Sequence, residues 1–218
     1  MVGVRNQLFT YDEAKTLAEP GSALAQLVDW VALSPMSGHP MRGKPGAVCP
    51  FLRQAAHADA FCVGISEAGP QDEDAVFHQV RGMFDDLGRI PADRERRALR
   101  SIVIGFPNCA GPEGVAMLER INKSHKYYTL ARLQMIAFFH ADSQSPGLWN
   151  PEFKPMRSPM PVIGARYLVE QDAVFAAKYK LMIPTYLMRF GVPGARKLIA
   201  AREMHRSAKI EVQKEEVA

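Results

Sequence analysis

The chain has 218 residues, of which 47% are hydrophobic and 23% charged, as in an ordinary globular protein. Its net charge is +4, its three cysteines are too few for a disulfide framework, and it has no run of the roughly 18 apolar residues that a membrane span needs. The polar start, MVGVRNQLFTYDEAK, does not resemble a signal peptide. We therefore expect a cytoplasmic protein with reduced thiols and no membrane partner.

Apolar periodicity predicts an alternation of helices and strands. In chain order the predicted elements are helices over 10–34 and 50–59, a strand over 60–66, a helix over 71–90, a strand over 99–106, a helix over 112–130, strands over 133–140 and 160–169, and C-terminal helices. No helix separates the last two strands, so they should pair antiparallel. The pattern predicts an α+β fold, with a single mixed or antiparallel sheet covered by helices and with helical N- and C-terminal segments.

We predict one catalytic or binding domain over 1–180 and a helical extension over 181–218. The C-terminal helices should break at Pro184 and at "GVPG", 191–194. Basic residues concentrate in these helices and in "DRERRALR", 93–100. No zinc-finger or RNA-binding signature accompanies them, so solvated helix faces are favoured over a nucleic-acid partner. Whether the chain forms a homodimer stays open.

Cys49 stands between a Gly- and Pro-rich loop, 34–48, and a helix that Pro50 should start. At the N-cap the helix dipole favours a thiolate, which can act as nucleophile, ligand or redox group. The alternative is a small buried residue that caps the turn. A structural zinc site would need four ligands, and neither a CxxC nor an HxxxH pair is present. A Cys–His enzyme with His140 or His125 as the base stays open, because spacing cannot identify the histidine.

The segment 141–159 is too long for a plain connection between two strands, and loops of this length are usually functional or disordered. Its prolines stiffen it and its apolar side chains favour burial, which predicts an ordered loop suited to cover a pocket. The loop begins after His140, and Arg157 near its end could clamp a carboxylate or a propionate. The alternative is a structural loop in which Arg157 bonds backbone carbonyls.

The motifs "RGKPGAVCPF" and "FFHADSQSPGLWNPEFKPMRSPMPVIGARYLVEQDAVF" resemble an uncharacterised bacterial domain family that is often found beside biosynthetic genes. The likeness covers about residues 25–180. The order Cys-Pro-Phe, strand, helix, "SIVI" and "RSP…ARYLV" is also distantly similar to the YqcI/YcgG-type family, which includes haem-dependent N-oxygenases of arginine and similar amino acids. The residues in matching places are Cys49, Arg157, Ser158 and Arg166. Where that family has a histidine before its Arg-Ser element, this chain has Phe153 and Lys154, and the nearest histidine is His140.

The resemblance implies a haem-dependent enzyme of amine or amino-acid oxidation, which forms an N–O or N–N bond in bacterial secondary metabolism. Its cofactor would be haem b and its substrate a small amine or amino acid. For such an enzyme we predict Cys49, His140 and Arg157 as catalytic residues and Phe139, Trp149 and Arg166 as cofactor-binding residues. The axial ligand would be His140, with Cys49 as the alternative. Phe138 and Phe153 could complete an apolar slot. Two alternatives are a cofactor-free enzyme with Cys49 as nucleophile, and a module that binds a small acid or haem without catalysis.

Overall fold

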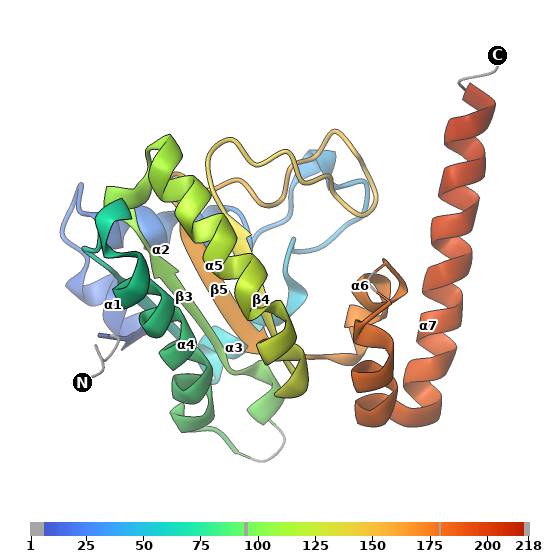
Figure 1. Cartoon of the computed structure of the whole chain (residues 1–218), viewed down its shortest axis with the longest axis horizontal. Helices are drawn as coiled ribbons and strands as arrows, with labels where there is room; N and C mark the ends of the chain where they lie inside the picture. Colours follow the sequence, from blue (N-terminus) through green and yellow to red (C-terminus); the bar gives the residue numbers. More distant parts are fainter. Residues whose placement is uncertain (1–6, 94–95, 179, 216–218) are drawn as a thin grey trace. The chain divides into compact units, whose positions relative to one another are not determined.

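The computed structural model describes residues 7–93, 96–178 and 180–215 (Figure 1). The helices are α1 (Tyr11–Leu17), α2 (Ala23–Leu33), α3 (Pro50–His57), α4 (Glu73–Arg89), α5 (Pro112–Ala131), α6 (Ala173–Lys178) and α7 (Met182–Glu215). The strands are β1 (Phe9–Thr10), β2 (Phe61–Ile65), β3 (Ser101–Gly105), β4 (Gln134–Phe139) and β5 (Val162–Tyr167). The sequence predicted each of these except β1, whose two residues are too few to show a period.

The five strands form one mixed sheet in the order β1-β2-β3-β5-β4. β1 runs antiparallel to β2, β2 parallel to β3, and β3 antiparallel to β5. The amide of His140 donates to Met156 O at one end of β4, and the amide of Leu168 donates to Leu133 O at the other. These bonds make β4 antiparallel to β5, as predicted. The predicted α+β class with a single mixed sheet is therefore confirmed.

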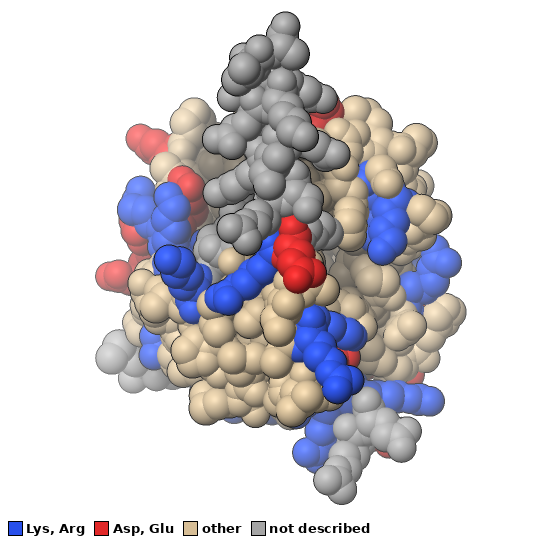
Figure 2. Space-filling model, turned by 90° about the vertical axis from the view of Figure 1, so that its right-hand side faces the viewer, with Lys and Arg blue, Asp and Glu red and all other residues tan. Residues whose placement is uncertain are grey.

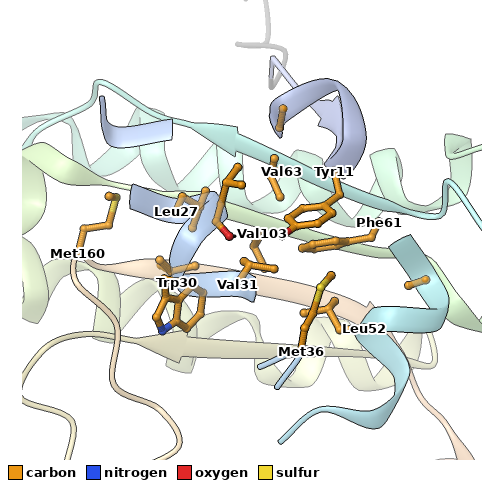
Figure 3. Packing of buried hydrophobic residues seen from close by; sticks show 14 residues of the cluster. Tyr11, Leu27, Trp30, Val31, Met36, Leu52, Phe61, Val63, Val103 and Met160 are labelled. Carbon is orange, nitrogen blue, oxygen red and sulfur yellow. Dashed lines mark hydrogen bonds between the residues drawn. The ribbon is translucent and has the colours of Figure 1, made fainter. Parts of the chain in front are cut away.

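Helices cover both faces of the sheet, with α1, α2 and α3 on one face and α4 and α5 on the other (Figure 1). On the first face, Leu27 and Val31 of α2 pack with Phe61, Val63 and Val103 of the strands (Figure 3). Alternate strand residues point to opposite faces. The intervening buried residues, such as Ile102 and Ile104, therefore face α4 and α5.

Local signals start the first helix and separate it from the second. Thr10 caps α1 in a reciprocal capping box: its hydroxyl accepts from the Glu13 amide at 3.3 Å, and the Glu13 carboxylate accepts from the Thr10 amide at 2.8 Å. Gly21 adopts a φ of +81° between α1 and α2, where a residue with a side chain would be strained. Ser22 then caps α2.

The described chain divides into two compact units, residues 7–127 with 135–167 and residues 128–134 with 168–215. The domain boundary predicted at residue 180 stays a prediction. The second unit contains α6 and α7, and the buried Tyr186 donates its hydroxyl to Glu170 O at 2.5 Å. Lys197 pairs with the Glu170 carboxylate at 2.6 Å. These contacts fasten α7 to the turn before α6.

The predicted break at Pro184 is wrong, because α7 begins at Met182 and Pro184 therefore lies in its first turn. In that turn a missing amide proton costs no intrahelical hydrogen bond. The break predicted at "GVPG" is confirmed: Gly191 has non-helical dihedral angles, φ 53° and ψ −139°, inside α7.

Figure 2 shows the described Lys and Arg side chains of one face in several groups, with Asp or Glu beside some of them. Several predicted basic positions, Arg94 and the side chains of Lys178, Arg206 and Lys209, lie outside the described residues. Among the helices described, none combines the length and the apolar character that crossing a membrane requires.

Candidate functional site

Two loops, the first loop (34–48) and the second loop (141–159), pack against each other beside the sheet. The ring of His39 stacks on Phe153 with centroids 4.7 Å apart. At the other end of the contact, Asn150 Nδ2 donates to Met41 O at 2.8 Å. Specific contacts therefore hold the second loop, and Phe153 is buried as its apolar side chain predicted, whereas Leu148 and Trp149 are exposed.

Trp30, near the end of α2, anchors the closing end of the second loop. Its indole Nε1 donates to Arg157 O at 2.9 Å. The same ring meets Phe139 of β4 edge to face, with centroids 5.2 Å apart. Trp30 is only 9% exposed, so this hydrogen bond is largely shielded from water. The backbone of Arg157 is thereby held to both α2 and the edge of the sheet.

The side chain of Arg157 is tied at one nitrogen, and the residue is exposed. Nε donates to Ser143 O at 3.2 Å, and the Ser143 amide donates to His140 O at 3.2 Å. Met156 O accepts from the His140 amide, so the two ends of the second loop lie side by side. We call this point, formed by His140, Ser143, Met156 and Arg157, the turn. The hydrogen bond from Nε to Ser143 O is of the kind that the structural alternative for Arg157 predicted, a bond to a backbone carbonyl. Among the described residues, no further hydrogen bond of its guanidinium group is found.

The ring of His140 lies on the face of the sheet that α5 covers. It stacks on Phe138, two residues earlier, with centroids 5.1 Å apart. The pKa of Glu119 on α5 is lowered, first by the hydrogen bond from Lys123 and to a smaller degree by the charge of His140. Phe139 points instead to the α2 face, where it meets Trp30. Phe138 and Phe139 therefore cannot line one side of the same slot.

Cys49 is the N-cap of α3, as predicted, but its side chain makes no capping hydrogen bond. Its amide donates to Pro35 O at 2.8 Å, and its half-buried side chain packs against the core under α2 and α3. This is the face of the sheet opposite to His140.

His125 is also on the α5 face. It is fully buried, its ring packs at a tilt against Phe77 with centroids 4.5 Å apart, and Nδ1 donates to Ile121 O at 2.8 Å. Burial lowers its pKa, and the charge of Arg81 lowers it further against the opposing effect of the Ile121 bond. Because the sheet lies between the α5 face and Cys49, neither His125 nor His140 is arranged as a base for that thiol.

Arg166 lies at the opposite edge of the sheet from Arg157. Its strand partner is Ser101 at the start of β3, whereas Val162, which follows the second loop, pairs with Gly105 at the end of β3. At about 3.3 Å per residue, the two positions in β5 are roughly 13 Å apart. The guanidinium of Arg166 lies 6.0 Å from the ring centroid of Phe51.

Trp149 lies at the outer part of the second loop and is 43% exposed. Lys44 Nζ sits 4.8 Å from its ring centroid. A Cβ at Gly43, which has a φ of +75°, would approach Trp149 O to 3.2 Å, so the first loop needs glycine where Trp149 crosses it. The ring therefore helps to join the two loops.

These positions do not fit a haem. A haem needs an apolar slot beside its axial ligand. Phe138 and Phe139 face opposite ways, Phe153 is already stacked on His39, and Trp149 contacts Lys44. Arg166, expected beside the cofactor, lies at the far edge of the sheet. In the described residues, no group of three or more His, Cys, Asp or Glu is placed to hold a metal ion.

What remains together is the turn formed by His140, Ser143, Met156 and Arg157. Sequence reasoning identified His140 and Arg157 from the loop that joins them. It missed Trp30 and Ser143, because a buried tryptophan on an amphipathic helix and a serine in a loop carry no signal of the residues they contact. It also missed Glu67, which follows β2, and Asn108, which follows β3. Their position after buried strands could be read from the sequence.

The chain belongs to the family described as a domain of unknown function (DUF6875), whose model matches residues 24–201. This agrees with the resemblance to an uncharacterised family seen in the motifs. Comparisons with the curated proteins and with the solved structures found no match.

Proposed function

We propose that this member of the DUF6875 family binds a small amine or amino acid that bears a carboxylate. The proposed site is the point where the two ends of the second loop meet, at His140, Ser143, Met156 and Arg157. The observation that carries the proposal is the tied guanidinium: Arg157 Nε is held by Ser143 O at 3.2 Å while the side chain as a whole is exposed. A guanidinium fixed at Nε has fewer orientations to lose when its terminal nitrogens bind a carboxylate.

The geometry of arginine suits this ligand. Its planar fork donates two parallel hydrogen bonds to a carboxylate, which a lysine cannot reproduce. A hydrogen bond to a charged group is worth about 1.5–3 kcal/mol. Loss of the Arg157 side chain should therefore weaken binding about tenfold to a hundredfold. Arg157→Lys should lose most of the same affinity, because it removes both the fork and the bond to Ser143.

Three compounds of similar chain length test the proposal by isothermal titration calorimetry: hexanoate, L-norleucine and pentylamine. The first two carry a carboxylate and should bind with an affinity that Arg157→Ala reduces. Arg42→Ala is the matched control, because Arg42 also binds backbone carbonyls, at Pro45 and Gly46, but in the first loop. Equal hexanoate affinity in wild type and Arg157→Ala would remove the proposal.

Haem-dependent oxidation of an amine or amino acid, by likeness to the YqcI/YcgG-type enzymes, is the second candidate. One observation favours it: the residues predicted as axial ligand and as propionate partner, His140 and Arg157, close the same turn. The packing of the aromatic rings counts against it, and we derive no step that passes through haem. A visible spectrum of protein expressed with added haem precursor tests it, because a Soret band that His140→Ala removes would support haem, and a colourless protein would exclude it.

The proposed location is the cytoplasm, as the sequence predicted. All three cysteines are free thiols, which a reducing compartment preserves.

A further inference from the structure

The parallel strands β2 and β3 end at the same edge of the sheet, and two adjoining cavities lie there. The first has a volume of about 270 Å³ and the second about 290 Å³, and Gln7, Ile65 and Glu67 line both. In open sheets with parallel strands, ligands bind in the crevice outside the carboxyl ends of the strands. The position of these cavities is therefore that of a ligand site.

The first cavity has a polar floor and acidic walls. Ser66 and Gln79 line it, are only 5% and 7% exposed, and share a hydrogen bond of 2.8 Å from Ser66 Oγ to Gln79 Oε1. Glu67 and Asp72 line the same space, and no lysine or arginine is present among its described lining residues. Among the described lining residues, two acidic side chains thus have no basic side chain beside them, which favours a positively charged ligand.

The second cavity continues from Glu67 along an apolar wall. Phe9 of β1, Leu24 of α2 and Ile65 of β2 line it, together with Ala23. A ligand that fits both cavities thus has a charged head and an apolar tail. Its head would lie beside Glu67 and its tail between β1 and the start of α2.

The acidic wall is held in place by neighbouring segments. Asn108, which follows β3, donates from Nδ2 to Glu67 O at 2.7 Å and to Glu67 Oε2 at 3.3 Å. The carboxylate of Asp72 accepts from the Gly69 amide at 2.8 Å. The charge of Asp72 also adds to the effect of burial in raising the pKa of Cys109. Both carboxylates are therefore fixed before a ligand arrives, which reduces the ordering cost of binding.

We propose that these cavities bind a primary amine with a short apolar tail. An ammonium group carries three donors, and the carboxylates of Glu67 and Asp72 supply acceptors for it. A metal ion is the less suitable cation, since the described residues offer no cluster of three ligands for one. The site is separate from Arg157: β2 and β4 are three strand spacings apart in the sheet order, or about 14 Å.

Titration with pentylamine, which is protonated at neutral pH, tests this site. Wild type should bind it, and Glu67→Gln should bind at least about tenfold more weakly, because it removes a charged hydrogen-bond partner. Methylamine should bind more weakly than pentylamine, by about fourfold for each methylene that the apolar wall covers. Asp29→Asn is the matched control: it changes the net charge equally at an exposed position of α2 outside both cavities.

The outcomes separate this proposal from the one at Arg157. Pentylamine affinity should fall in Glu67→Gln and stay unchanged in Arg157→Ala. Hexanoate affinity should fall in Arg157→Ala and stay unchanged in Glu67→Gln. No binding of pentylamine to the wild type, or an equal loss in Glu67→Gln and Asp29→Asn, would overturn the amine site and leave the carboxylate site untouched. Because Glu67 is exposed, its substitution should leave the thermal unfolding midpoint in place, and that measurement verifies the fold.

Discussion

The two tryptophans of the chain allow one substitution to be compared in two environments. Trp30→Phe removes the donor to Arg157 O at 2.9 Å and part of the ring of a residue that is only 9% exposed. A net hydrogen bond contributes about 0.5–1.5 kcal/mol. A buried ring that shrinks leaves a cavity with a further cost. We expect the free energy of unfolding to fall by about 1–3 kcal/mol, the range expected for loss of buried contacts.

Trp149→Phe is the matched control. Trp149 is 43% exposed and Lys44 lies over its ring, an exposed cation–π contact worth about 0.5–1 kcal/mol that phenylalanine partly keeps. Its free energy of unfolding should therefore change by less than about 0.5 kcal/mol. Urea unfolding followed by far-UV circular dichroism measures both variants on one scale. Equal effects of the two substitutions would refute the role of Trp30 as the anchor of the second loop.

Three further predictions follow from the cysteines and from a buried histidine. Cys49→Ser should leave the free energy of unfolding unchanged or raise it by up to about 1 kcal/mol in urea titration, because Cys49 makes no capping hydrogen bond and serine is a preferred N-cap. Loss of ligand binding with the fold intact would instead point to a chemical role of the thiol. Iodoacetamide near neutral pH should modify Cys49 before the others, as peptide mapping can show, since burial raises the pKa of Cys62 to about 11 and also raises that of Cys109. Because burial lowers the pKa of His125 from 6.5, the unfolded chain takes up its proton first as pH falls. Stability should therefore hold above about pH 6.5 and decline below it, and His125→Gln should flatten that decline in urea titrations; an unchanged slope would contradict this account.

Most of the fold was predictable because its local signals agree with each other. Pro50 and Pro112 each start a helix, Thr10 caps one, and the apolar stripe of α4 matches its buried residues. Pro184 misled the prediction because proline disrupts a helix interior but not its first turn. The sequence could not reveal that α7 begins just two residues earlier, at Met182.

The candidate site was only partly predictable, because strand alternation decides which neighbours in the sequence share a face. His140 and Phe139 are adjacent in the chain, yet one ring contacts Phe138 on the α5 face and the other contacts Trp30 on the α2 face. The pairing of β5 with β3 likewise sends Arg166 to the edge opposite Arg157. Strand register, which no short motif encodes, therefore separated residues that the resemblance had grouped.

The order of strands also decides how the two proposed sites can be used. β4 runs antiparallel to β5, and β5 antiparallel to β3, so β2, β3 and β4 all end at one edge of the sheet. Glu67 and His140 follow strands at that edge, about 14 Å apart by strand spacing. The amine and carboxylate of an α-amino acid are attached to the same carbon and cannot span this distance. L-norleucine held at Arg157 should therefore keep its affinity in Glu67→Gln, and a fall in that affinity would mean that the carboxylate and amine sites act as one.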